Sequence, residues 1–141
     1  MAKRKRVWVI RIDPENKDLT EIHIDPVLQQ YYFWIGCTCI EAVVREVNDK
    51  EVNVLKQQSS RHIRMYVDEI GAFTSKPTFF VRTKYGTEEL IGKALLIGDP
   101  DDDGEETDCL WSLDDVRKFI FFDLQSLRRY VHDNGARNQG S

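Results

Sequence analysis

Three carboxylates that could converge on a cation lie in an acidic stretch of the chain. Asp99, Asp101 and Asp103 occupy alternate positions, and Gly104 follows them. This pattern matches the first half of a calcium loop, where alternating carboxylates surround the ion and a glycine permits the sharp turn. The second half of the stretch does not match a calcium loop, because Leu110 occupies the twelfth position, where the loop needs a bidentate glutamate. The stretch therefore favours a solvated acidic turn, with calcium binding by these three aspartates as the alternative.

The cysteines offer a second possible source of metal or redox chemistry. Cys37 and Cys39 are separated by one residue, whereas zinc sites space paired cysteines by two or more and need two further ligands. Residues at this spacing face the same side of a strand, so two small core thiols are the simpler interpretation. Cys109 brings the number of cysteines to three. This odd number, together with the lack of a secretory signal, predicts a reducing, cytoplasmic environment.

Catalytic machinery is not recognisable in the sequence. His23, His62 and His132 stand in no nucleophile elbow, and His23 alternates with isoleucines as a solvent-facing strand residue does. The sequence contains no glycine-rich phosphate loop of the Rossmann or Walker type. We therefore predict a protein without catalytic activity and without a cofactor.

Aromatic and cationic side chains could still hold a nucleotide by stacking and charge. The candidates for such a ligand or partner site are Tyr31, Tyr32, Trp34, Arg82, Lys84 and Tyr85. The alternative is that the first three of these belong to the hydrophobic core, since aromatic residues at helical spacing usually pack inward.

The N-terminus begins with a basic arm, residues 1–6, in which Lys3, Arg4, Lys5 and Arg6 are consecutive. Such an arm could contact nucleic-acid phosphates or an acidic partner, with binding that weakens as salt rises. The net charge of −4 argues against a surface built wholly for nucleic acid. No apolar run approaches the length of a membrane span, so no membrane association is expected.

Local patterns indicate mostly strands with helices near the middle and the end. Asp25 and Pro26 resemble a helix start, and Gly36 a helix stop, around Leu28, Tyr31, Tyr32 and Ile35 at helical spacing. Ser112 and Asp115 fit a capping box that opens a short helix, and Asp123 could cap a terminal helix reaching His132. We expect strands at 7–12, 19–24, 38–47, 63–67, 79–83, 90–97 and 119–122.

These elements predict an α+β fold with a mixed, mostly antiparallel sheet, a short aromatic helix packed on it and a C-terminal helix. Residues 7–133 would form a single domain, which a chain of 141 residues can stabilise with its own core. We interpret residues 48–62 as a hairpin extension or a mobile loop, and residues 134–141 as a disordered tail.

Several short motifs stand in an order typical of one family. They are Ile12-Asp13-Pro14, Ile35-Gly36-Cys37, Tyr66-Val67-Asp68-Glu69 with Gly71 behind it, Gly92–Gly98 before an acidic turn, and a Leu-Asp-Asp-Val helix. Over residues 7–122 the chain resembles the small proteins grouped as DUF3846, a domain of unknown function carried mostly by bacteriophages and mobile elements. It departs from them by a longer insert around 48–62, by the stretch after Glu69, and by the extension 123–132.

The resemblance brings no established activity, but it implies a phage accessory protein acting in a bacterial cytoplasm. The leading hypothesis is a non-enzymatic protein that binds a host protein, for instance in a defence system. The alternatives are a binder that sequesters a nucleotide signal and a weak DNA-binding factor. Bunched aromatic residues and the additional helix are compatible with a homodimer.

Overall fold

Two antiparallel sheets organise the protein. The computed structural model describes residues 5–47, 62–71 and 75–139, and of residues 134–139 it describes the backbone only. The larger sheet has the order β2-β1-β7-β4-β3, and the smaller has the order β6-β5-β8. The larger contains β1 (Val7–Asp13), β2 (Asp18–Ile24), β3 (Ile40–Glu46), β4 (His62–Asp68) and β7 (Ala94–Ile97); the smaller contains β5 (Thr78–Thr83), β6 (Gly86–Ile91) and β8 (Ile120–Phe121).

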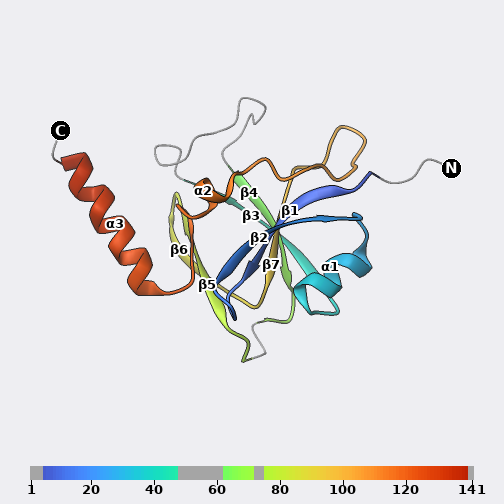
Figure 1. Cartoon of the computed structure of the whole chain (residues 1–141), viewed down its shortest axis with the longest axis horizontal. Coiled ribbons are helices and arrows are strands. Elements are labelled where there is room, and N and C mark those ends of the chain that lie inside the picture. The colour runs from blue at the N-terminus through green and yellow to red at the C-terminus, as the bar shows by residue number, and fades with distance from the viewer. Residues whose placement is uncertain (1–4, 48–61, 72–74, 140–141) are drawn as a thin grey trace.

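The described part of the chain also contains three helices: α1 (Leu28–Ile35), α2 (Leu113–Val116) and α3 (Leu124–Gln139). Figure 1 shows α1 beside the larger sheet, on the side away from β5 and β6, and α3 extending outward from the smaller sheet. The predicted α+β fold, with its helix on a sheet and its C-terminal helix, is confirmed. All strand pairings among the described residues are antiparallel, and the strands divide between two sheets.

The alternation of side chains along each strand of the larger sheet creates two separate cores. Ile63 and Met65 of β4 point toward the smaller sheet, where they share a cluster with Phe79 and Val81 of β5. Tyr66 of β4 points the other way and belongs to a second cluster, which lies under α1. The protein therefore has three layers, α1, the larger sheet and the smaller sheet, because successive strand residues face opposite sides.

The two sheets are joined at one edge by polar contacts. Arg45 of β3 forms a two-pronged ion pair with Glu88 of β6, with Nη2 2.9 Å from Oε1. The backbone N–H of Lys84, in the β5–β6 turn, donates to the carbonyl of Glu46 at 2.9 Å. These contacts hold the edge strands of both sheets together, which leaves fewer unpaired backbone groups there.

The expected single strand at 90–97 is wrong. The chain leaves the smaller sheet after Ile91 and enters the larger one at Ala94, so the stretch belongs to two strands, β6 and β7. Gly92, between them, has φ of 86°, a left-handed conformation that glycine adopts without steric cost. Apolar residues on both sides of Gly92 and Lys93 concealed this change of sheet, although only β7 is buried along its whole length.

The expected start of the first helix is also wrong. The helix begins at Leu28 after Val27, which is extended and makes no side-chain cap. The Asp25 carboxylate instead accepts from Arg6 Nε at 3.3 Å, and its carbonyl accepts from the Val27 N–H. Asp25 therefore cannot act as the N-cap, and the helix is shorter than its apolar sequence suggested.

The C-terminal elements follow the predicted order. Ser112 caps α2 by accepting from the Asp115 N–H, residues 120–121 form a strand, and Asp123 accepts from the Ser126 N–H at the start of α3. However, α3 continues to Gln139, where we expected a disordered tail from residue 134. Gly and Asn weaken a helix without stopping it, and no proline intervenes. Residues 140–141 lie outside the described residues, as do residues 48–61 of the loop predicted at 48–62, whereas His62 begins β4.

Candidate functional site

The short helix α1 carries more apolar side chains than it buries. Its sequence, Leu-Gln-Gln-Tyr-Tyr-Phe-Trp-Ile, buries only Tyr31 and Ile35 against the larger sheet. Gly36 ends the helix in a left-handed conformation, with φ of 76°, and its N–H donates to the Tyr32 carbonyl at 2.7 Å. Apolar residues in excess of the buried face of a helix are normally covered by another element. Among the described residues, Phe33 and Leu28 of α1 have no such cover.

Large apolar side chains remain on the outer surface of α1. Phe33 is 72% exposed and Leu28 is 53% exposed. Phe33 packs edge-on against Trp34, with ring centroids 5.2 Å apart, and Trp34 in turn lies 5.5 Å from the Arg11 guanidinium. We call Leu28, Tyr32, Phe33 and Trp34 the aromatic ridge. The fold itself does not need Phe33, so the ridge is a candidate contact surface.

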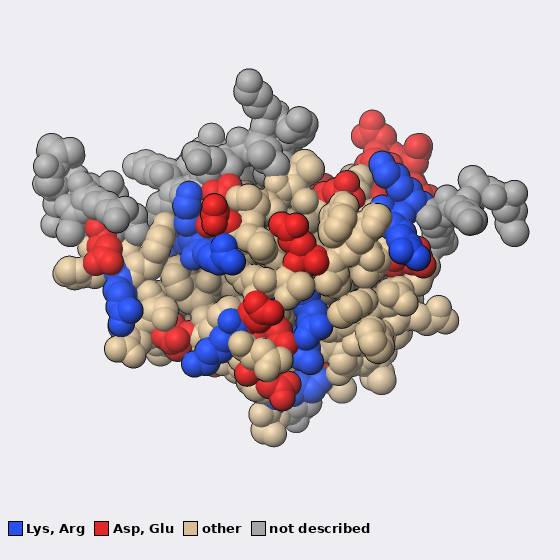
Figure 2. Space-filling view, in the orientation of Figure 1, with Lys and Arg blue, Asp and Glu red and all other residues tan. Residues whose placement is uncertain are grey.

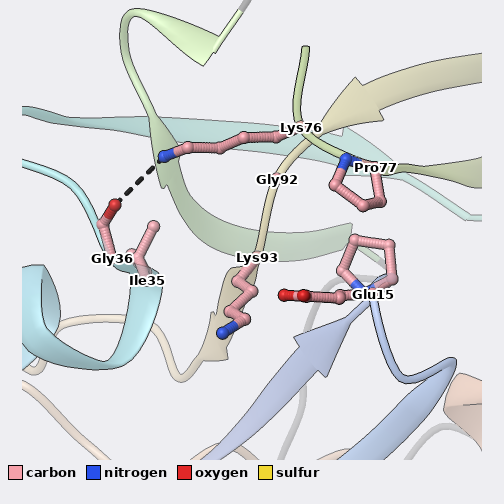
Figure 3. A pocket seen from close by; sticks show the side chains of 8 residues that line it. Glu15, Ile35, Gly36, Lys76, Pro77, Gly92 and Lys93 are labelled. Atoms are coloured by element: carbon pink, nitrogen blue, oxygen red, sulfur yellow. Dashed lines mark hydrogen bonds between the residues drawn. The ribbon is translucent and has the colours of Figure 1, made fainter. Parts of the chain in front are cut away.

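A pocket of about 150 Å³ adjoins the C-terminal end of α1. Figure 3 shows its lining, which comes from four separate segments: the β1–β2 turn, the end of α1, the residues before β5, and the β6–β7 connection. Pro14, Ile35 and Pro77 form apolar walls. The pocket is smaller than the roughly 300–1,000 Å³ typical of small-molecule sites, so it suits a single side chain better than a nucleotide.

Lys76 forms one rim of the pocket and is firmly held. Its Nζ donates to Asp68 Oδ2 at 2.9 Å and to the Gly36 carbonyl at 3.0 Å, as Figure 3 shows for the second bond. The Asp68 carboxylate is only 2% exposed, and its other oxygen accepts from the Ile70 N–H. Lys76 therefore compensates a buried charge and links β4 to the end of α1, while one of its three N–H donors remains for another group.

Lys93 supplies the pocket with a second positive charge. Among the residues that the structure describes it forms no ion pair. The Glu15 carboxylate points toward it in Figure 3. The pocket thus offers an ammonium group and a carboxylate beside apolar walls, a combination that fits a polar protein side chain better than a phosphate.

Asp13 lies buried at the base of the same turn. Burial acts to raise its pKa, but hydrogen bonds from Asn16 and Arg11 outweigh burial and lower the pKa, with a further contribution from Lys93. Arg11 Nη2 donates to Asp13 Oδ2 at 2.8 Å, and the backbone N–H groups of Glu15 and Asn16 donate to Oδ1. The ionised Asp13 therefore fixes the turn that presents Glu15.

The six residues predicted as a ligand site are not brought together. Tyr31 lies in the core against Tyr66, and Tyr32 and Trp34 lie half-buried on α1. Arg82 belongs to β5 of the smaller sheet, where its guanidinium lies over Tyr130 of α3. Lys84 and Tyr85 occupy the β5–β6 turn and contact Glu46. Among the described residues these side chains form no common aromatic and basic pocket.

The predicted basic arm is only partly described. Lys3 and Arg4 lie outside the described residues, Lys5 is exposed, and Arg6 pairs with Asp25 at 3.3 Å.

The acidic stretch folds back on itself. The Asp101 carboxylate accepts from the N–H groups of Asp103 and Glu105, and Asp99 pairs with His62 at 2.9 Å. No group of three or more His, Cys, Asp or Glu side chains that could hold a metal occurs within the described ranges. The Asp101 carboxylate therefore stabilises the turn itself.

The cysteines do not form the pair of core thiols that the sequence suggested. Both precede β3: Cys37 is half-buried and Cys39 is exposed. Burial raises the pKa of Cys37, and it raises the pKa of Cys109 to about 12. A thiol with so high a pKa is a poor nucleophile at neutral pH.

Comparisons with known proteins add no assignment. No protein family matches the chain, and no curated protein or solved structure shows significant similarity to it. In the part of the chain that the structure describes, no helix is both long and apolar enough to cross a bilayer.

Sequence reasoning missed Phe33, Lys76 and Lys93. One signal was available for Phe33: six of the eight residues of α1 are apolar, more than one face of a short helix can bury. The lysines had no such signal, because their neighbours come from segments distant in sequence.

Proposed function

We propose that this chain is a non-enzymatic binding protein that docks onto a partner protein through the aromatic ridge and the lysine pocket beside it. The observation that carries the proposal is Phe33, a large aromatic side chain 72% exposed on a helix in which six of eight residues are apolar. Aromatic residues dominate the energetics of protein interfaces, where they enter pockets on the partner at a modest cost in side-chain entropy.

The neighbouring pocket adds specificity to this surface. Ile35 and Gly36 belong to α1 or its end and also line the pocket, so the pocket adjoins the helix that carries the ridge. Lys93 and Glu15 offer a polar side chain of the partner one charge of each sign. Charged groups at such a rim mainly select the partner and its orientation.

The biological setting of the proposal comes from the resemblance to DUF3846 proteins. In that setting the chain acts as a phage accessory protein inside a bacterium, and the partner is a host protein. Sequestration of a nucleotide signal finds less support, since the six residues expected to form its pocket are divided between α1 and the smaller sheet. Weak DNA binding through residues 1–6 is the third hypothesis.

Native mass spectrometry after incubation with bacterial lysate distinguishes a protein partner from a small ligand. The proposal expects an added mass of a whole protein on the wild type, lost in a Phe33→Ala variant and retained in Tyr85→Ala. Tyr85 is the matched control because it is an aromatic residue 81% exposed at the β5–β6 turn, away from α1. An added mass of a few hundred daltons that survives Phe33→Ala contradicts the proposal and favours the nucleotide binder.

A further inference from the structure

A second pocket lies on the face of the larger sheet that carries Ile10, opposite to the face that α1 covers. Its volume is about 340 Å³, and its lining includes Trp8, Glu21, Asp108 and Leu110. Ile10 and Trp111 of the inter-sheet core also line it, so it sits at the open end of that core. Neither α1 nor the lysine pocket contributes to it.

Trp8 is an exposed aromatic wall held in a fixed orientation. It is 47% exposed and stacks on His23, with ring centroids 4.5 Å apart and planes inclined by 12°. Because His23 covers one face of the indole, the exposed area belongs to its other face and its edges. The backbone of Trp8 is fixed as well: its N–H donates to Asp108 Oδ1 at 2.9 Å, and its carbonyl accepts from Cys109.

The charge of the pocket is wholly negative. Glu21 and Asp108 line it, and among the described residues no cationic side chain does. Neither carboxylate forms an ion pair with another described residue. Of the cationic residues nearest to Trp8 in the sequence, Arg6 pairs with Asp25 and Arg11 pairs with Asp13.

The surroundings strengthen the negative potential. The stretch 99–108 carries the carboxylates of Asp99, Asp101, Asp102, Asp103, Glu105, Glu106 and Asp108. Figure 2 shows acidic side chains gathered at the upper right, where Figure 1 places this stretch. A negative potential of this kind attracts cationic groups over a Debye length of about 8–10 Å.

We infer that this pocket binds an arginine side chain presented by a basic segment of a partner protein. An arginine guanidinium is planar, stacks on an indole face and donates in pairs to carboxylates, whereas a lysine ammonium is a point charge with no plane to stack. Trp8 supplies the face, and Glu21 and Asp108 supply the acceptors. This site is independent of the proposed docking of α1 and lies on the other side of the sheet.

A titration of the full-length protein with short peptides tests the inference. The probes are acetyl-Ala-Arg-Ala-amide and, for comparison, the Lys and Gln analogues, added to ¹⁵N-labelled protein at about 0.15 M salt. The readout is the indole N–H signal of Trp8, assigned with a Trp8→Phe variant. We expect saturable shifts of this signal with the Arg peptide, weaker ones with Lys, and none with Gln.

Two variants, each of which removes one negative charge, distinguish binding in the pocket from general electrostatic attraction. Glu21→Gln removes a carboxylate that lines the pocket, and Asp102→Asn removes one from the acidic stretch outside it. We expect Glu21→Gln to weaken Arg-peptide binding about three- to tenfold, and Asp102→Asn to change it less than about twofold. Equal losses in both variants, or an Arg peptide that leaves the Trp8 signal unmoved, overturn the inference.

Discussion

Lys76 Nζ lies 2.9 Å from Oδ2 of Asp68, whose carboxylate is 2% exposed. The pair joins the end of β4 to the end of α1, since the same ammonium also donates to the Gly36 carbonyl. The lysine that borders the candidate pocket is thus part of the fold as well as of the surface.

Replacing Lys76 by methionine should destabilise the protein, because it leaves the Asp68 carboxylate buried without its ionic partner. We expect a loss of about 1–3 kcal/mol in the free energy of unfolding, measured by urea denaturation. The matched control is Lys84→Met, which removes an exposed ion pair of 3.8 Å with Glu46 and should cost less than about 0.5 kcal/mol. Equal effects of the two variants would show that the buried pair does not stabilise the fold.

Truncation of two phenylalanines should have very different effects on the free energy of unfolding. Phe79 is fully buried between the sheets, so Phe79→Ala should cost about 3–5 kcal/mol through lost burial and the cavity left behind. Phe33 is 72% exposed, so Phe33→Ala should change the free energy of unfolding by less than about 0.5 kcal/mol. Chemical denaturation of both variants measures this. A large loss for Phe33→Ala would mean that the residue serves folding and would remove the main reason for placing it in an interface.

Acid should weaken the protein partly through Asp13. The folded-state pKa of Asp13 is lowered, so its ionised form contributes stability above its unfolded pKa of about 4. This contribution is lost as pH falls through the lowered pKa. The difference in the free energy of unfolding between wild type and Asp13→Asn should therefore be constant near neutral pH and shrink below about pH 4. Urea titrations at several pH values measure it, with exposed Asp102→Asn as the control. A difference independent of pH would contradict the assignment.

The cysteines should differ in reactivity. Cys39 is exposed, whereas burial raises the pKa of the Cys109 thiol to about 12. At pH 8, iodoacetamide should modify Cys39 first and Cys109 at least about tenfold more slowly, until denaturant is added. Peptide mapping by mass spectrometry identifies the modified residue. Early modification of Cys109 in the folded protein would disagree with its burial.

The sequence allowed most of the secondary structure to be predicted, because the relevant signals are local. Alternation of apolar residues identified β1 and β2, Gly36 marked the end of α1, and Asp123 marked the start of α3. The division of residues 90–97 between two sheets was not predictable from hydrophobicity, since Leu90 and Ala94–Ile97 are all apolar. The chain passes from one sheet to the other at Gly92, whose left-handed backbone conformation cannot be read from hydrophobicity.

The candidate site was less predictable than the fold. Tyr31 and Phe33 belong to the same aromatic run, yet one is buried and the other is exposed, and this depends on where α1 rests on the sheet. Lys76 and Lys93 are separated in sequence by two strands and lie together only in the folded protein. Pairings of this kind depend on tertiary packing, for which a single sequence offers no periodic pattern.

Photo-crosslinking from position 33 tests the central proposal most directly. Replacing Phe33 with p-benzoylphenylalanine places a crosslinker on the aromatic ridge, and the same replacement at Tyr85 places one on an exposed turn as the control. In irradiated bacterial cells we predict one discrete crosslinked product of higher mass from position 33 and none from position 85. No product from position 33, or the same products from both positions, would contradict the proposal that this protein acts by docking a partner on α1.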